Sequence, residues 1–248
     1  PRVDPSVYKK QEENIDTSLK LLNILNENFK NSEIPCLRNF KAVIIGGFAI
    51  KKHAESLKLP ITYQTSDIDV KICGSNDPQY VQEIMDSIPD EYKQLEQYGV
   101  PDPLSGISSS FTKLQGHPNL QLLPIMRAKI ISILHPKIVK LNNNNQKKNK
   151  LIPLWEVRNS LRPKESPNVF LSENYPIKVF YGQNLVLDIS FSFREQKSQS
   201  ILCDSFEYMF KGKDKFKIPM AKLSSLAENL LAYTSKMNLK DSLIKEKI

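Results

Sequence analysis

The chain has 248 residues, 40% of them hydrophobic, and a formal net charge of +8. This length predicts one large domain or two small ones, with enough apolar side chains for a core. The three cysteines, Cys36, Cys73 and Cys203, are far apart and form no C-x-x-C motif. Their spacing argues against a disulfide framework or a zinc site and favours a reducing compartment. No apolar run is long enough to span a membrane, so we expect a cytoplasmic protein with no membrane partner.

The first 41 residues contain one amphipathic helical pattern. Its apolar stripe consists of Leu19, Leu22, Ile24, Leu25 and Phe29. Positions three and four apart lie on one side of a helix, so this stripe predicts a helix that packs against the rest of the fold. A role in binding a partner is the alternative.

The next pattern combines a strand, a glycine turn and a helix. The β-branched run Val43–Ile45 stops at Gly46 and Gly47, after which Phe48 opens an apolar-periodic segment. Glycines allow the backbone to come close to a triphosphate, and the N-terminus of a helix favours anions. We therefore expect nucleotide phosphates to bind at Gly46 and Gly47.

A second strand is predicted from Ser66 to Ile72. Side chains alternate along a strand, so Asp67 and Asp69 are expected on the same face. Their charges repel each other unless a cation lies between them, and hard oxygen ligands suit Mg²⁺ or Mn²⁺. The alternative is an ordinary solvent-facing strand that carries two aspartates.

A third aspartate lies inside a very apolar strand. The sequence predicts a strand at Ile177–Tyr181, a turn at Gly182–Asn184 and another strand at Leu185–Phe193. Asp188 is the one charge among the first residues of the second strand. Burial of a lone carboxylate is costly unless it is paired or bound to a metal. Asp188 is thus a candidate metal ligand, with a hydrogen-bonded structural aspartate as the alternative.

The positive charge of the chain is concentrated in its middle. Ten basic residues and one acidic residue lie between Arg127 and Lys164, whereas the rest of the chain is near neutral. A buried helix is predicted at Leu122–Leu134, followed by a low-complexity polar loop that spans Asn142–Lys150. This loop is either a solvated connection or a contact to nucleic acid. Farther on, an apolar stripe predicts a helix at Pro219–Met237.

Together, the G-G-F-A and T-S-D-I-D-V segments and the later aspartate resemble the polymerase-beta-like nucleotidyltransferase superfamily. They are most similar to the viral-type poly(A) polymerase catalytic subunits of large DNA viruses. The resemblance covers roughly residues 40–72 and 175–240. One departure is that many members have serine after the first glycine, where this chain has Gly47.

The resemblance implies an α/β (α+β) fold: a small mixed, largely antiparallel sheet with packed helices, an N-terminal helix and a helical C-terminal segment. It divides the chain into an N-terminal helical segment (1–41), a nucleotidyltransferase domain (42–200) and the C-terminal segment (201–248). The middle domain then contains a long basic insertion at about 99–175. A full second helical domain does not fit, which indicates a truncated, minimal or oligomeric enzyme or one with a partner subunit.

The function implied by the resemblance is template-independent addition of AMP from ATP to an RNA 3′ end, by two-metal catalysis with Mg²⁺ or Mn²⁺. Such an enzyme acts in mRNA processing, in the cytoplasm or in a viral factory or virion. The implied residues are Asp67, Asp69 and Asp188 for catalysis and metal, Gly46, Gly47, Ser66, Tyr233 and Lys236 for the nucleotide, and Lys147, Lys148 and Lys150 for RNA. One alternative is a small toxin- or resistance-type nucleotidyltransferase that modifies tRNA, a protein or a small molecule. Another is a catalytically idle nucleic-acid-binding subunit.

Overall fold

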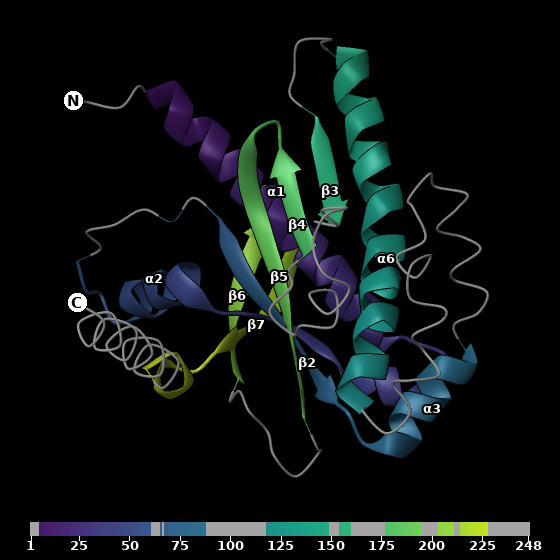
Figure 1. The fold of residues 1–248 in the computed structure, drawn as a ribbon. Helices are drawn as coiled ribbons and strands as arrows, with labels where there is room; N and C mark the ends of the chain where they lie inside the picture. Colours follow the sequence, from purple (N-terminus) through teal and green to yellow (C-terminus); the bar gives the residue numbers. More distant parts are fainter. Residues whose placement is uncertain are drawn as a thin grey trace, which may run out of the picture.

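The computed structural model describes residues 5–60, 65, 67–87, 118–148, 154–159, 177–194, 203–210 and 214–227 (Figure 1). Its helices are α1 (Pro5–Lys30), a short 3-10 helix (Pro35–Asn39), α2 (Gly46–Ser56), α3 (Pro78–Ser87) and α6 (Pro118–Lys148). Its strands are β1 (Lys41–Ile44), β2 (Ile68–Ser75), β3 (Trp155–Asn159), β4 (Ile177–Tyr181), β5 (Asn184–Arg194), β6 (Cys203–Phe210) and β7 (Asp214–Ala221).

The described strands form one mixed sheet of seven strands in the order β3-β4-β5-β2-β1-β7-β6. Two neighbouring pairs, β2 with β5 and β1 with β7, are parallel, and the other four are antiparallel. The expected mixed α/β architecture and the N-terminal helix are therefore confirmed. The expected strand-turn-strand at residues 177–193 is also confirmed, as β4 and β5.

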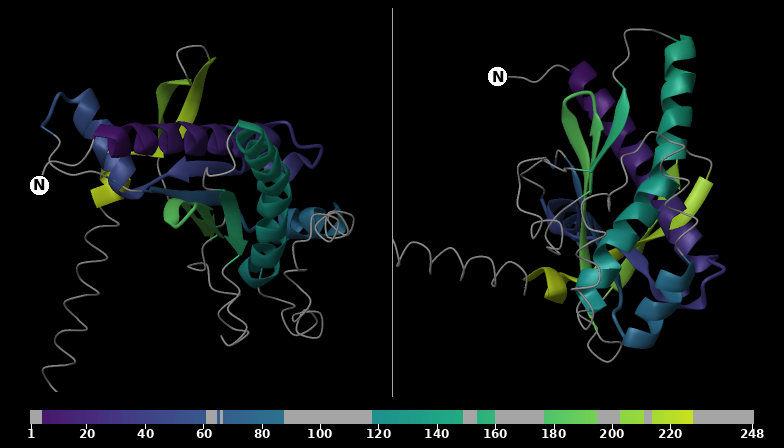
Figure 2. Two further views of the ribbon diagram at one scale, coloured as in Figure 1. Left: turned by 90° about the horizontal axis from the view of Figure 1, so that it is seen from above. Right: turned by 45° about the vertical axis from the view of Figure 1, so that its right-hand side comes forward.

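One face of the sheet is apolar and carries the core. In the first part of β2 the buried residues are Ile68, Val70 and Ile72, and the residues between them are half-buried. Helix α1 contacts β1, β5 and β7, and α6 contacts β3 and β5 (Figures 1 and 2). Aromatic rings join α1 to the sheet. The centre of the Phe40 ring lies 6.2 Å from the centre of the Phe29 ring of α1 and 5.8 Å from that of Phe193 of β5. Burial of these apolar side chains holds the helices against the sheet.

Two asparagine side chains fasten helices to strands. Asn26 of α1 accepts a hydrogen bond from the Ala42 amide (2.8 Å) and donates one to the Ala42 carbonyl (3.1 Å). Asn142 of α6 does the same to both backbone groups of Trp155, each at 2.7 Å. In each case one side-chain amide satisfies a backbone donor and acceptor, as a neighbouring strand would.

The predicted polar loop at Asn142–Lys150 is wrong over the residues described. Helix α6 continues to Lys148, and residues 149–153 lie outside the described part of the chain. The helix is maintained because Ile138 is buried, Leu141 packs against the core and Asn142 bonds Trp155. A run of asparagines carries little helix propensity of its own, so tertiary contacts decide its conformation.

The predicted helical C-terminal segment is also wrong at its start. Residues 203–221 include β6 and β7, and helical residues begin only at Leu223. From Lys215 onward, β7 alternates between exposed lysines and buried or half-buried apolar residues, which is the period of a strand. The sheet thus extends past residue 200, because β7 pairs with β1 at Ile44 and Met220.

The opposite face of the sheet is polar where β4, β5 and β2 meet. Lys178, Asp188 and Asp69 are half-buried there, as are Lys71 and Ser190 one step along β2 and β5. No helix in the described parts of the chain is both long and apolar enough to cross a membrane.

Candidate functional site

Asp69 and Asp188 come from segments far apart in the sequence and lie directly opposite each other. In the parallel pair of β2 and β5 their Cα atoms are partners in register. Both side chains leave the sheet on the polar face, because the residues on either side of each, such as Val70 and Ile189, are buried on the other face. The two carboxylates are thus neighbours on one surface.

Lys178 extends this row by one strand. It is the register partner of Asp188 in the antiparallel pair of β4 and β5, and its Nζ atom lies 2.9 Å from Asp188 Oδ2. The hairpin contains a register shift between Val179 and Phe180, which leaves Val186 without a partner on β4. Without that extra residue Lys178 would face Leu187 rather than Asp188. Bulges commonly redirect side chains near functional sites.

Gly46 closes the other side of Asp69. Its φ of +65° is in the left-handed region, and a Cβ atom built there would collide with Asp69 Oδ2. The Ile45 amide, one residue earlier, donates a hydrogen bond of 2.9 Å to the Asp69 carbonyl. Glycine is needed at Gly46 both for the backbone angle and for the space that the carboxylate occupies. This requirement is separate from the expected phosphate contact.

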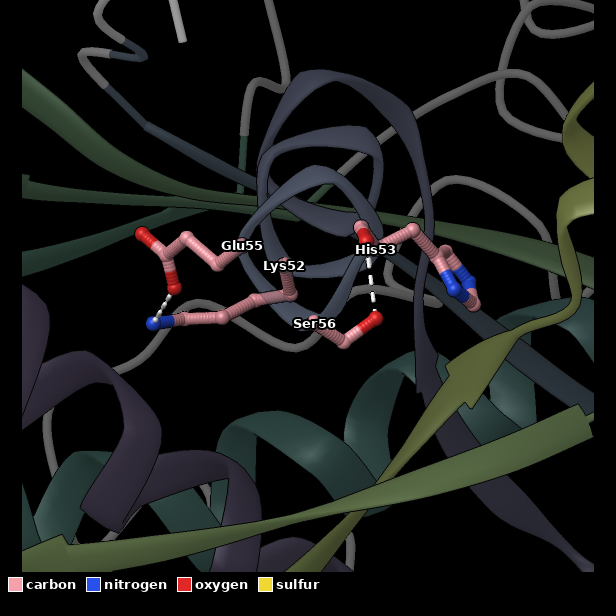
Figure 3. Close-up of polar contacts among 4 residues, drawn as sticks. All are labelled: Lys52, His53, Glu55 and Ser56. Atoms are coloured by element: carbon pink, nitrogen blue, oxygen red, sulfur yellow. Dashed lines mark hydrogen bonds and ion pairs between the residues drawn. The ribbon is translucent and has the colours of Figure 1, made fainter. Parts of the chain in front are cut away.

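Helix α2, which begins at Gly46, is anchored at its far end. His53 Nε2 lies 2.9 Å from the carbonyl oxygen of Ala221 in β7, and Ser56 donates a hydrogen bond to the His53 carbonyl. Figure 3 shows the His53 ring on one side of α2 and the ion pair between Lys52 and Glu55 on the other. The N-terminus of α2 therefore has a defined position beside Asp69. The N-cap residue, Ile45, makes no side-chain hydrogen bond to the first turn of the helix.

Neighbouring charges act on the Asp69 carboxylate. The pKa of Asp69 is raised from its ordinary 3.8 to about 6, chiefly by partial burial and then by the negative charges of Asp67 and Asp188. The charge of Lys178 opposes this rise. Asp67 itself is half-buried and immediately precedes β2, rather than lying within it as predicted. Asp67 and Asp188 are thus both close enough to Asp69 to affect its charge state.

The donor set is compatible with a divalent cation, although it is not a complete cage. No group of three His, Cys, Asp or Glu side chains within the described ranges is arranged to hold a metal ion by itself. Mg²⁺ is commonly bound by only one or two carboxylates, with water and substrate phosphates as its other ligands. Asp69 and Asp188 lie side by side with Asp67 close by, and these carboxylates fit that chemistry. The Lys178 ammonium, which is bonded to Asp188, is not a metal ligand.

The other expected site residues are only partly described. Gly47 is the second residue of α2, whereas Ser66, Lys150, Tyr233 and Lys236 lie outside the described residues. Lys147 and Lys148 are in the last turn of α6, with only their backbone described. The nucleotide and RNA roles of these residues therefore remain predictions.

Part of the central basic segment is not on the surface. Arg127 and Lys129 of α6 are 3% and 8% exposed, and the Arg127 guanidinium lies 5.8 Å from the centre of the Phe191 ring. Trp155 is also in the core, with its ring 5.1 Å from that of Tyr181, so it is not available for stacking on a base. Lys137 and Lys140 are exposed. The charge offered to a polyanion is thus smaller than the sequence count indicates.

Lys178 was not among the residues identified from the sequence. A signal was present, since it is the one charged residue of a short apolar strand that forms a hairpin with the strand of Asp188. The tight turn alone, however, pairs Lys178 with Leu187, and only the register shift brings it to Asp188. A bulge of this kind has no clear sequence marker here.

Comparison of the chain with protein-family models, with curated proteins and with solved structures gives no match.

Proposed function

We propose that the protein is a template-independent nucleotidyltransferase that adds AMP from ATP to an RNA 3′ end, as poly(A) polymerases do. The observation that carries the proposal is the register of Asp69 with Asp188 beside Gly46 and the N-terminus of α2. The proposal includes the finer fold class, a nucleotidyltransferase sheet in which β2 and β5 carry the catalytic carboxylates.

In this proposal Asp67, Asp69 and Asp188 hold Mg²⁺ or Mn²⁺, which supplies charge neutralisation at the phosphates and a more acidic acceptor hydroxyl. The backbone of Gly46 and Gly47 receives the triphosphate at the start of α2, where the helix dipole favours negative charge. Asp188 accepts the proton of the 3′-hydroxyl, whose oxygen bonds to the α-phosphate of ATP while pyrophosphate leaves. The apolar core behind β2 and β5 fixes the two strands, so the carboxylates keep their spacing while the substrates bind.

The test is a primer-extension reaction. The 248-residue chain is incubated with Mg²⁺ or Mn²⁺, a labelled RNA and each nucleoside triphosphate in turn, with Asp69→Asn as the inactive control. A ladder of products with ATP alone supports the proposal. Absence of extension with every nucleotide and both metals overturns it.

A nucleotidyltransferase with a small or protein acceptor is the second candidate. The observation in its favour is the burial of Arg127 and Lys129, which reduces the exposed positive charge of the basic segment. The same reaction, with tRNA or a protein as the acceptor, distinguishes this candidate. Addition of only one or two nucleotides to tRNA supports it, and so does labelling of a protein in place of RNA. A catalytically idle subunit would bind RNA without any transfer.

A further inference from the structure

The ion pair between Lys178 and Asp188 differs from an ordinary surface pair in its position. The two side chains are 31% and 22% exposed, so both are partly withdrawn from water. Their partner strands bring them together in register, which fixes the geometry from both sides. Asp188 is at the same time the neighbour of Asp69 on β2. Lys178 thus places a fixed positive charge in direct contact with Asp188, while Lys71, two residues from Asp69 on the same face, is a second lysine near the carboxylates.

We propose that Lys178 is a positioning residue: its ammonium group neutralises Asp188 until a divalent cation binds, and in doing so sets how tightly the site binds that cation. This inference rests on the proposed function, because it assumes that Asp188 and Asp69 receive a metal ion.

Charge balance supports the inference. Without a positive charge nearby, neighbouring ionised carboxylates on one sheet face would repel each other. Lys178 reduces this repulsion at both neighbours, since it bonds Asp188 directly and its charge also acts on Asp69. The same ammonium repels an arriving divalent cation. Lys178 therefore both stabilises the metal-free protein and weakens metal binding.

The test measures Mn²⁺ binding by calorimetry, without nucleotide, on the full chain. Lys178→Met nearly keeps the length of the side chain and removes its charge. We expect its Mn²⁺ dissociation constant to fall roughly tenfold, as Coulomb's law gives for a single and a double charge a few ångströms apart in water. Lys178→Arg keeps the charge and bonds a carboxylate more firmly, so we expect weaker Mn²⁺ binding than in the wild type. This second variant tests the inference even if Lys178→Met does not fold.

The matched control is Lys52→Met, which removes the 2.8 Å ion pair with Glu55 on α2. Its Mn²⁺ affinity should equal that of the wild type. Thermal unfolding gives the second readout. In the presence of a chelator, Lys178→Met should unfold at a lower temperature than Lys52→Met. Addition of Mn²⁺ should then raise the Tm of Lys178→Met by more than it raises the Tm of the wild type.

Three results separate the inference from the proposed function. Equal Mn²⁺ affinities for wild type and both Lys178 variants overturn the inference but leave the metal site intact. Absence of Mn²⁺ binding in every protein overturns both. Tighter binding by Lys178→Met together with no nucleotide transfer by the wild type supports the inference for the metal site and overturns the proposed reaction.

Discussion

Asp69 and Asp188 occupy matching positions on two adjacent parallel strands, β2 and β5, although more than a hundred residues separate them in the chain. Each belongs to a strand whose opposite face is buried in the core. Because a slip by one residue would turn either side chain to the other face, the hydrophobic pattern itself keeps the two carboxylates together.

We expect Asp69→Asn and Asp188→Asn each to lower the rate of nucleotide transfer by orders of magnitude, because each loses a charged ligand while keeping its shape. Primer extension with ATP and Mg²⁺ measures the effect. Asp86→Asn is the matched control, since Asp86 is exposed on α3 and accepts a hydrogen bond from Gln82 on the same helix. Near-normal turnover by Asp69→Asn or Asp188→Asn would make that residue structural.

Metal-free stability should depend on pH through Asp69. Its pKa is raised from 3.8 to about 6 in the folded protein, mainly by burial and then by Asp67 and Asp188. The folded state thus holds this proton more tightly than the unfolded state. The contribution of Asp69 to the free energy of unfolding is therefore greatest below pH 3.8. It falls as the pH rises from 3.8 to about 6 and is constant at higher pH, and the total decrease is at most about 3 kcal/mol.

Urea unfolding of metal-free protein between pH 4 and 8 measures this loss. Asp69→Asn cannot ionise at this position, so the difference between it and the wild type isolates the Asp69 contribution from other titrating groups. The variant should be the more stable protein at pH 7. A difference that does not change with pH would show that the Asp69 carboxyl has the same pKa in both states.

Gly46→Ala should both destabilise the protein and reduce transfer. The new methyl group meets Asp69 Oδ2 and the backbone remains at positive φ, so we expect a loss of about 1–3 kcal/mol. Gly182→Ala has a similar φ of +61° at the hairpin turn and serves as the control for backbone strain alone. Thermal unfolding and primer extension of both variants give the comparison. Equal effects on transfer would contradict a special relation between Gly46 and Asp69.

The run of asparagines near the end of α6 should contain one structural residue. Asn142→Ala leaves the Trp155 amide and carbonyl without the partner that they have now, and we expect a loss of about 1–3 kcal/mol. Asn143→Ala, at an exposed neighbouring position, should change stability by less than about 0.5 kcal/mol. Chemical denaturation of the two variants distinguishes a helix fastened to β3 from a solvated loop, for which both substitutions would be neutral.

The last prediction concerns the RNA acceptor. If Lys147, Lys148 and Lys150 contact an RNA backbone, replacement of all three by Gln should flatten the dependence of log affinity on log salt by about two units. Fluorescence anisotropy with a short RNA at several salt concentrations measures the slope. Lys215 and Lys217, exposed on β7, provide a control double replacement by Gln. Identical slopes for wild type and triple variant would remove this end of α6 from the RNA path.

The sequence alone located the glycine turn and the aspartates of the candidate site, although not Lys178. The glycine turn after Val43–Ile45, the alternation around Asp69 and the lone charge of Asp188 are local patterns, set by hydrophobic period and turn chemistry. They correctly indicated β1, β2, β4 and β5 and the helix that begins beside them. Local patterns have this power because each strand or helix must present one apolar face to a core.

Only the tertiary structure decided how these parts meet. The pairing of β2 with β5 is a contact between distant segments, and a register shift within the hairpin of β4 and β5 brings Lys178 to Asp188. Likewise, the hairpin of β6 and β7 joins this sheet because β7 pairs with β1, and α6 extends through Asn142 because that side chain bonds Trp155. Propensity is a weak preference that burial and hydrogen bonding to a distant partner override, so no local pattern in the chain contains these outcomes.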